Sequence, residues 1–340
     1  MTNQTVRIGY IGAGKFSRSR LLPRLKSIPG VELVVVANST SESSQKVAQE
    51  VGFARSAKDW REVVEAKDVD AIVVGTRTAT HPEICVPVLE AGKHLLCMNA
   101  IAPNYEGAQA MLKASEARPK QVALVYPAQF YMREEVMMQW LLQEKYVGKV
   151  LHVFDYWYTR FFGLGSQFEV ASRWFGQHSR VFGYRKGFDI AARGQDHHAR
   201  DVRPESNVVL AELASGATLT YIHSTVAGES AMNRFEVYGD LGSIVCYPQA
   251  NATLGAEAKV GFYGARTADR ELRPIPVPAQ IKAAVEDPLG VPVEAEFIAA
   301  VRGQKQPSAA VSRFIDGVRL MQFANAWRKS SESGTWSPVP

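Results

Sequence analysis

Residues 6–17 read Val-Arg-Ile-Gly-Tyr-Ile-Gly-Ala-Gly-Lys-Phe-Ser, an apolar run that ends in closely spaced glycines. Gly12 permits a tight turn where a buried strand ends, and Gly14 lets a pyrophosphate approach the backbone at the start of a helix. Ser17 stands where the G-x-G-x-x-G fingerprint has its third glycine, and it is also small. The stretch predicts a strand, a phosphate-binding turn and a helix, as in a dinucleotide-binding domain.

The same stretch also fits the spacing of a nucleotide-triphosphatase loop. Residues 9–15 match G-x-x-x-x-G-K, and Phe16 follows Lys15. A P-loop needs Ser or Thr after the lysine to hold magnesium. The triphosphatase interpretation is therefore rejected.

The first 125 residues alternate between buried-strand and helix patterns. Nearly continuous Val, Ile and Leu is typical of strands covered on both faces. Strand and helix in turn predict a doubly wound parallel sheet, hence an N-terminal Rossmann domain over residues 1–125. The expected strands are 6–11, 32–37, 71–75, 94–97 and 121–126, with helices from Ser41 to Val51 and from Thr80 to Gly92.

Residues 126–340 have a different pattern, with short turns at 214–216 and 239–242. Short turns join antiparallel neighbours, so we expect a C-terminal α/β domain with an open, mostly antiparallel sheet. The helix at 312–329 is a candidate to pack back toward the first domain. The expected strands are 150–160, 206–214, 217–225, 233–238 and 243–247, followed by a connecting loop at 273–278 and helices at 293–302 and 312–329.

Composition excludes several classes of protein. With 46% hydrophobic and 21% charged residues, the chain is neither fibrous nor disordered. The net charge of +5 comes from basic residues scattered singly, which is not a nucleic-acid footprint. No apolar run approaches the roughly 18–20 residues of a membrane span, and the N-terminus has no signal pattern. Three cysteines have no metal-ligand spacing, so we expect no metal and a cytoplasmic protein.

The end of the second strand bears on the choice of dinucleotide. Asn38 stands where an acidic residue would grip the ribose 2′-hydroxyl of NAD. Without that carboxylate a 2′-phosphate is tolerated, and the hydroxyls of residues 39–41 with Lys15 are candidate ligands for it. The sequence therefore favours NADP over NAD.

Landmarks along nearly the whole chain resemble the Gfo/Idh/MocA oxidoreductase family. The resemblance implies a Rossmann domain, an α/β domain with an open antiparallel sheet, a small-molecule substrate between them, and assembly into a homodimer or homotetramer through the sheet. The matching stretches are the glycine turn, Asp70–Thr76, His81-Pro-Glu-Ile, Leu89–Cys97, Gly148–Val150, Arg173–Gly176, Gly239–Ser243 and Glu294–Phe297.

The family's catalytic motifs do not carry over. The family's Glu-Lys-Pro corresponds here to Met98-Asn99-Ala100, and its Asp-x-Gly-x-His corresponds to residues 163–167, with Gly163 and Gln167 at the acid and base positions. The family's next aspartate corresponds to Val170. Asn99 and Gln167 can orient a carbonyl but cannot usefully exchange protons. Either other residues move the proton or the site is catalytically silent.

Candidate replacements come from aromatic and histidine residues. Tyrosine can act as a general acid beside a cation, so Tyr126, Tyr156 and Tyr158 are the first candidates. His81 is a further candidate, with a structural helix cap as its alternative. Asp196-His197-His198 is interpreted as a solvated loop rather than a metal site.

The sequence thus predicts an NAD(P)-dependent oxidoreductase that acts on a sugar, polyol or related cyclic substrate with atypical acid-base residues. A silent dinucleotide- or sugar-binding regulator, and an NAD-assisted lyase or glycosidase, remain alternatives. The expected substrate contacts are Asn99, Arg160 and Gln167. The expected cofactor contacts are Gly12, Gly14, Lys15, Phe16, Asn38, Ser39, Thr40, Thr76, Arg77, His81, Met98 and Asn99.

Overall fold

The computed structural model describes residues 4–126, 132–158, 165–188, 205–226, 232–248, 260–286, 292–308 and 311–340. Contacts divide the chain into two units, Met1–Ala128 with Pro292–Met321, and Gln129–Val291 with Gln322–Pro340. The sequence assigned residues 126–340 to the second domain, with the helix at 312–329 as a candidate to pack back toward the first, and the contacts group residues 292–321 with the first unit. One reason is an ion pair between Arg24 and the buried Glu294 at 3.1 Å.

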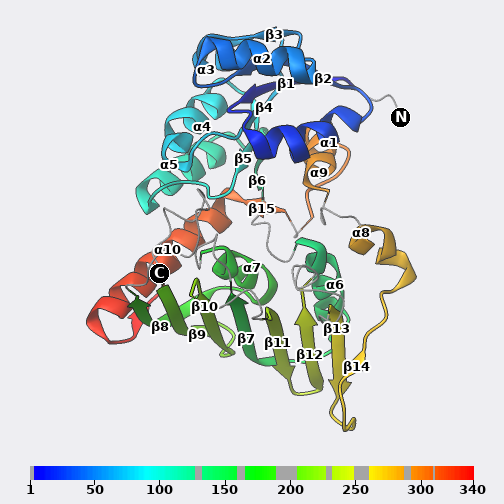
Figure 1. The fold of residues 1–340 in the computed structure, drawn as a ribbon, viewed down its shortest axis with the longest axis vertical. Coiled ribbons are helices and arrows are strands. Elements are labelled where there is room, and N and C mark those ends of the chain that lie inside the picture. The colour runs from blue at the N-terminus through cyan, green and yellow to red at the C-terminus, as the bar shows by residue number, and fades with distance from the viewer. Residues whose placement is uncertain are drawn as a thin grey trace. The chain divides into compact units, whose positions relative to one another are not determined.

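The first unit contains a seven-stranded sheet in the order β15-β6-β5-β4-β1-β2-β3 (Figure 1). All pairs are parallel except β15 with β6. The predicted doubly wound parallel sheet is confirmed, and the strands begin and end close to their predicted positions. Their bounds are β1 Val6–Ile11, β2 Val31–Ala37, β3 Arg55–Ser56, β4 Ala71–Val74, β5 His94–Met98, β6 Ala123–Tyr126 and β15 Ser312–Arg313.

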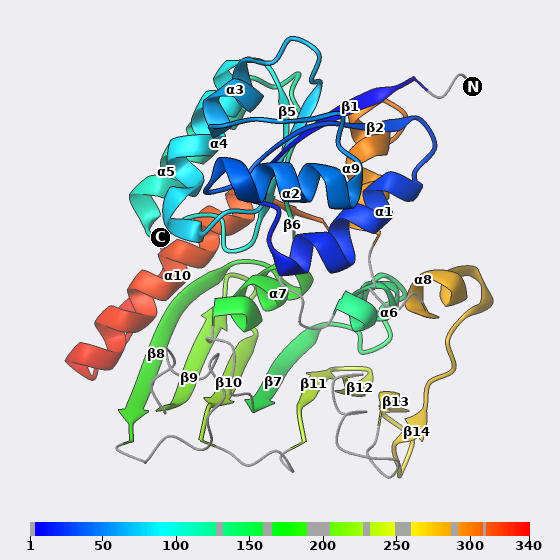
Figure 2. The same cartoon turned by 45° about the horizontal axis from the view of Figure 1, so that its top comes forward.

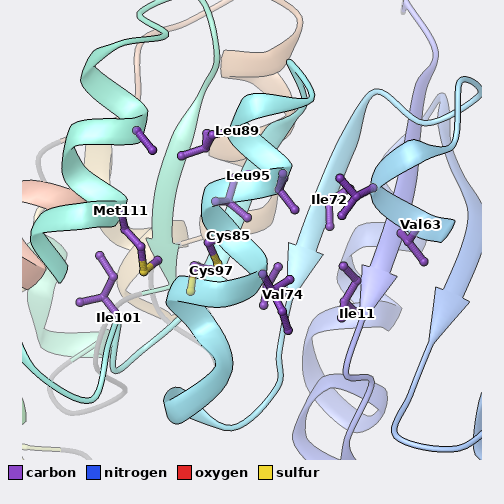
Figure 3. Close-up of a cluster of buried hydrophobic side chains, with 14 of the residues drawn as sticks. Ile11, Val63, Ile72, Val74, Cys85, Leu89, Leu95, Cys97, Ile101 and Met111 are labelled. Carbon is purple, nitrogen blue, oxygen red and sulfur yellow. The ribbon is translucent and has the colours of Figure 1, made fainter. Parts of the chain in front are cut away.

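Helices cover both faces of this sheet. α3, α4 and α5 pack on one face, where their side chains form a cluster with the strands that includes Cys85 and Cys97 (Figure 3). α1 and α9 lie beside each other on the opposite face (Figure 2). The helices are α1 Leu22–Ser27, α2 Ser41–Val51, α3 Trp60–Glu65, α4 His81–Glu90, α5 Tyr105–Glu116 and α9 Val293–Val301, with a π-helical turn Ser17–Leu21 before α1 and a 3-10 turn Thr78–Thr80 before α4.

The second unit contains a nine-stranded sheet in the order β14-β13-β12-β11-β7-β10-β9-β8-β16. Its pairs are antiparallel except that β7 and β10 run parallel, so the sheet is mostly antiparallel, as predicted, but is not a simple meander. The 273–278 stretch, predicted as a loop, contributes the edge strand β14. The strands are β7 Val150–Tyr158, β8 His178–Gly187, β9 Glu205–Leu213, β10 Thr218–Ser224, β11 Arg234–Gly239, β12 Gly242–Tyr247, β13 Gly261–Arg266, β14 Arg273–Pro274 and β16 Ser337–Pro338.

One face of the second sheet is covered by helices (Figure 2). Phe168 of α7 meets Tyr221 of β10 with ring centroids 4.9 Å apart, and Trp174 of α7 meets Phe235 of β11 at 5.2 Å. The opposite face carries side chains such as Tyr184 and Leu210 that are exposed. The helices of this unit are α6 Met132–Gln143, α7 Gly165–Phe175, α8 Lys282–Glu286 with a 3-10 turn Ala279–Ile281 before it, and the end of α10 Phe314–Ser333.

Within the described ranges, no helix is long and apolar enough to cross a membrane.

Candidate functional site: a groove at the carboxyl ends of the parallel strands

A groove of about 860 Å³ opens at the carboxyl ends of β1, β2 and β4. Every side of it comes from the first unit. Ligands of doubly wound sheets bind at this edge, where neighbouring connections leave the sheet in opposite directions. Its lining comprises Ile11, Gly12, Ala13, Gly14, Arg18, Ala37, Asn38, Ser39, Ser43, Lys46, Val47, Lys58, Asp59, Trp60, Gly75, Thr76, Arg77, Thr80, Glu83 and Ile84.

The glycine turn forms the floor of the groove. Gly12 has φ +83°, and its N–H donates to the carbonyl of Ala37 at 2.8 Å. A Cβ there would lie 2.6 Å from Cγ2 of Thr76, so only glycine fits. Gly14 is different, because a Cβ there would meet no atom of the described residues within 4 Å. The space beside the Cα of Gly14 is thus open at the start of the helix that spans residues 15–27, while its N–H donates to the carbonyl of Gly12 at 2.9 Å.

Asn38 fastens this turn to the next helix. Its Oδ1 accepts from the N–H of Ala13 at 2.8 Å, and its Nδ2 donates to Oγ of Ser43 at 3.0 Å. The hydroxyl of Ser44 accepts from the Asn38 N–H at 2.9 Å. Thr40 caps α2 by accepting from the N–H of Ser43 at 3.1 Å. The strand end that carries an acidic residue in NAD-binding domains therefore presents an amide and hydroxyls here.

Basic side chains predominate on the lining, which suits an anionic ligand. Arg18, Lys46, Lys58 and Arg77 are basic, while Asp59 and Glu83 are acidic. Both carboxylates already contact the guanidinium of Arg61, at 3.1 Å and 3.6 Å. Arg18 pairs with Glu50 at 2.8 Å across the helix surfaces.

The predicted cofactor residues divide into two sets. Six line the groove and six do not. Among the second set, Lys15 is exposed beside the turn, and the ring of Phe16 meets the ring of Tyr126 edge-on at 6.0 Å. Met98 is paired with Tyr126 across β5 and β6. The lining set is Gly12, Gly14, Asn38, Ser39, Thr76 and Arg77, and the others are Lys15, Phe16, Thr40, His81, Met98 and Asn99.

The four catalytic candidates lie in three different environments. His81 is 1% exposed at the start of α4, among backbone carbonyls. Tyr126 is 3% exposed at the end of β6 in the first unit. Tyr156 and Tyr158 alternate along β7 with the buried Asp155 and Trp157, so they point to the sheet face away from α7. The guanidinium of Arg234 lies 3.9 Å from the ring centre of Tyr156.

Gln167 is the predicted substrate residue with the clearest signature. It lies in the first turns of α7 and is 1% exposed, and neither Oε1 nor Nε2 has a hydrogen-bond partner among the residues that the structure describes. A buried amide without partners is rare and marks a place where water or a ligand completes the bonding. Arg160, Gly163 and the 196–198 cluster lie outside the described residues. Asn99 follows β5 and is half-buried.

Sequence reasoning missed several lining residues. Arg18 lies one helical turn after Gly14, and its position could have been found from that spacing. Lys46 follows Ser43 on α2, so the helix start at Ser41 pointed to it. Lys58, Asp59 and Trp60 had no local signal, because the entry to α3 reaches the groove only through the pairing of β2 with β3.

Comparison with known proteins tests the fold and the first unit. Residues 6–126 match the family model described as "Oxidoreductase family, NAD-binding Rossmann fold". These residues belong to the Gfo/Idh/MocA family. The resemblance drawn from the sequence is confirmed over this range, which contains the glycine turn and the groove.

Curated relatives of the Gfo/Idh/MocA type match over the same part of the chain. A 4-carboxy-2-hydroxymuconate-6-semialdehyde dehydrogenase of Sphingobium is 34% identical over 33% of this chain and 35% of its own length. An inositol 2-dehydrogenase of Saccharopolyspora erythraea is 31% identical over 36% of each chain. The matched region thus spans about a third of the length of these relatives.

Solved structures extend the likeness in fold to the whole chain. Levoglucosan dehydrogenase in complex with NADH and levoglucosan superimposes with a TM-score of 0.80. It covers 99% of this chain and 100% of its own, at 20% sequence identity. The predicted Gfo/Idh/MocA architecture, a Rossmann domain followed by an α/β domain with a mostly antiparallel sheet, is confirmed.

Proposed function

We propose that this protein is an NAD(P)-dependent oxidoreductase that transfers hydride to or from a small sugar, polyol or related cyclic substrate. The observation that carries the proposal is the basic groove at the open backbone of Gly14, in a chain whose fold matches that of a dehydrogenase bound to NADH and a sugar. Relatives of the first unit include dehydrogenases of inositol and levoglucosan.

The residues of the groove fit a dinucleotide. The bare backbone at Gly14 and the helix start behind it suit a pyrophosphate, and Arg18 and Arg77 supply positive charge on the lining. Thr76 and Asn38 hold the two walls against the glycine turn. When bound, the nicotinamide supplies the hydride chemistry. The chain's own task is to orient the cofactor and the substrate and to move a proton.

We propose NADP as the preferred cofactor. Asn38 uses its amide to hold the turn, and no carboxylate stands at the end of β2. Ser39, Ser43 and Lys46 line the groove next to it, and hydroxyls with an ammonium group suit a 2′-phosphate. NAD lacks that phosphate and would leave these groups without an ionic partner.

On the substrate side, we propose that the amide of Gln167 hydrogen-bonds a substrate hydroxyl or carbonyl, with Asn99 and Arg160 as further contacts. Its burial and its two unpartnered atoms support this role. An amide cannot take up a proton near neutral pH, so the proton is assigned to a tyrosine, with Tyr126 first because it lies at the carboxyl end of β6 beside Met98.

A silent regulator is the second candidate function. It is favoured by the amides at positions 99 and 167, which bind without exchanging protons. Such a protein would bind the dinucleotide in the same groove without turnover.

We also propose that the protein forms a homo-oligomer. The sheet face away from α7 carries Tyr184, Val208, Leu210 and Tyr238, which are 57%, 38%, 41% and 37% exposed. Large exposed apolar patches are typical of association surfaces. Light scattering coupled to size exclusion measures the assembly, and a strict monomer contradicts this part.

The test is a titration of cofactor-stripped protein with NADPH and with NADH, followed by nicotinamide fluorescence and by the thermal midpoint. We expect micromolar binding, with NADPH bound more tightly than NADH. Binding is also expected to raise the thermal midpoint, because a ligand that binds only the native state stabilises it. Screening polyols and sugars for absorbance change at the nicotinamide band then separates an oxidoreductase from a regulator. Absence of binding to either dinucleotide contradicts both.

A further inference from the structure

His81 lies at a junction of the first unit that the proposed chemistry does not use. It opens α4 and is 1% exposed. Nδ1 lies 3.0 Å from the carbonyl oxygen of Ala100 and 3.1 Å from that of Ile101, and Nε2 lies 3.1 Å from that of Thr76. The ring is thus placed between the wall of the groove and the segment that follows β5.

The protonation of this ring follows from its neighbours. A neutral imidazole has one N–H donor and one lone pair. With carbonyl oxygens at both nitrogens, either neutral tautomer would point a lone pair at a carbonyl oxygen. Only the imidazolium donates at both ends, so the contacts to Thr76 and to Ala100 are satisfied together only when His81 is charged.

A cysteine whose thiolate would serve as counter-ion lies next to the ring. Sγ of Cys97, from β5, is 3.4 Å from Nδ1 of His81, and Cys85 of α4 lies beside Cys97 in the same buried cluster (Figure 3). Burial opposes ionisation of Cys97, but hydrogen bonds with Cys85 and with His81 lower its pKa to about 6. Burial likewise disfavours the charged ring, but the hydrogen bond to Cys97 and its charge leave the pKa of His81 raised.

We infer that His81 is a positioning residue of the groove, whose doubly protonated ring, paired with the sulfur of Cys97, ties the backbone of Thr76 to that of Ala100 and Ile101. The inference rests on the proposed dinucleotide binding. Thr76 lines the groove and meets the glycine turn, because a Cβ on Gly12 would lie 2.6 Å from its side chain. Loss of the ring's charge therefore loosens a wall of the groove.

Dinucleotide binding is expected to weaken as the pH rises. Raising the pH removes a proton from His81, so one ring nitrogen then faces a carbonyl oxygen with a lone pair in place of an N–H, and the wall of the groove loosens. Replacing Cys97 by alanine removes the counter-ion, so the loss of binding moves to lower pH. Two ionisable groups act on the ring. Cys97 of β5 acts on it directly, and Cys85 of α4 acts through Cys97.

The experiment measures the dissociation constant of NADPH between pH 6 and 9 for four proteins. In the wild-type protein we expect affinity to fall about tenfold with rising pH, the loss of one hydrogen bond to a charged group. Cys97→Ala shifts that fall to lower pH. His81→Asn binds weakly at all pH values, with no such fall. The matched control Cys246→Ala, also a buried cysteine but in the second unit, behaves like the wild type.

A second readout does not depend on the ligand. In protein labelled with ¹⁵N-histidine, both ring nitrogens of His81 are expected to carry protons at neutral pH, with the signal assigned by its loss in His81→Asn. Signals of a singly protonated ring overturn the inference even if NADPH binds. The inference is also overturned if NADPH binding to the wild-type protein is independent of pH and is unchanged in Cys97→Ala. Failure of the wild-type protein to bind any dinucleotide overturns the proposed function itself, and this inference with it.

Discussion

The groove of the first unit and the helix-covered face of the second sheet differ in how their amide side chains are bonded. Around the glycine turn, the amide of Asn38 has both of its ends hydrogen-bonded within the unit. In the second unit, both polar atoms of Gln167 and Oδ1 of Asn207 have no hydrogen-bond partner among the described residues. The first region is built by backbone and local contacts, whereas the second keeps polar groups at an energetic cost, as sites of function do.

The strongest test of this comparison fills the open backbone. Gly14→Val is expected to weaken dinucleotide binding at least about a hundredfold, because the new side chain occupies the space where phosphate approaches. The fold should survive, since no described atom lies within 4 Å of the added Cβ. Fluorescence titration and the thermal midpoint measure the two effects. Ser19→Val, exposed on the same helix, is the control, and equal losses in both variants would contradict the assignment.

A histidine of the second unit tests the cost of buried polar groups there. His178 meets Tyr221 at 2.7 Å, and burial lowers its pKa to about 3. The unfolded chain takes up this proton near pH 6.5. Below that value the unfolded state binds more protons, so acid lowers stability, by up to about 1.4 kcal/mol per pH unit. The loss is absent above pH 6.5.

His178→Gln should flatten this slope, and the exposed His152→Gln should not. Urea unfolding between pH 4.5 and 7.5, followed by tryptophan fluorescence, measures it. Parallel pH profiles in all three proteins would show that the folded chain protonates His178 readily.

The preference between NADPH and NADH tests the role of Asn38 in the groove of the first unit. Asn38→Asp can still accept from Ala13 but adds a negative charge where a 2′-phosphate would lie. We expect the ratio of NADPH to NADH affinity to fall about tenfold or more, because like charges repel and a ribose hydroxyl is preferred. Asn104→Asp, at the cap of α5, controls for the added charge. An unchanged ratio would place the discriminating contacts elsewhere.

The smallest effect is expected at the orphaned amide. Gln167→Leu keeps the volume and removes two unpartnered polar atoms, so the free energy of unfolding should rise by about 1 kcal/mol. Turnover of the substrate found by screening should fall. The exposed Gln143→Leu should change neither. A variant that is less stable than the wild type would mean that the amide is bonded in solution.

Prediction from sequence succeeded where local chemistry decides the structure. The run from Val6 to Ser17 fixed the first strand and turn because glycine spacing and apolar residues leave few other conformations. β8 was not predicted, since His178–Gly187 carries two glycines and five charged or polar side chains (His178, Ser179, Arg180, Arg185 and Lys186) without regular alternation. The parallel pairing of β7 with β10 was also missed, because register and order depend on contacts between distant segments.

The candidate site shows the same division. Gly12 and Gly14 follow the end of β1, and Asn38 follows the end of the neighbouring β2, so a motif could identify them. Trp60 reaches the groove only through the fold. Tyr126 ends a strand of the first unit and Tyr156 lies on a strand of the second, as the sequence indicated. Which face of β7 the helices cover could not be predicted, because strand alternation alone does not say which face is covered.

The return of residues 292–321 to the first unit bears on how the protein is made. β15 adds the last strand to the Rossmann sheet, and Glu294 meets Arg24, yet both come from the final fifty residues of the chain. During synthesis, the first 128 residues leave the ribosome without these partners. If the N-terminal domain folds during synthesis, its sheet therefore keeps an unpaired edge at β6 until the second unit has been translated and β15 can pair with it.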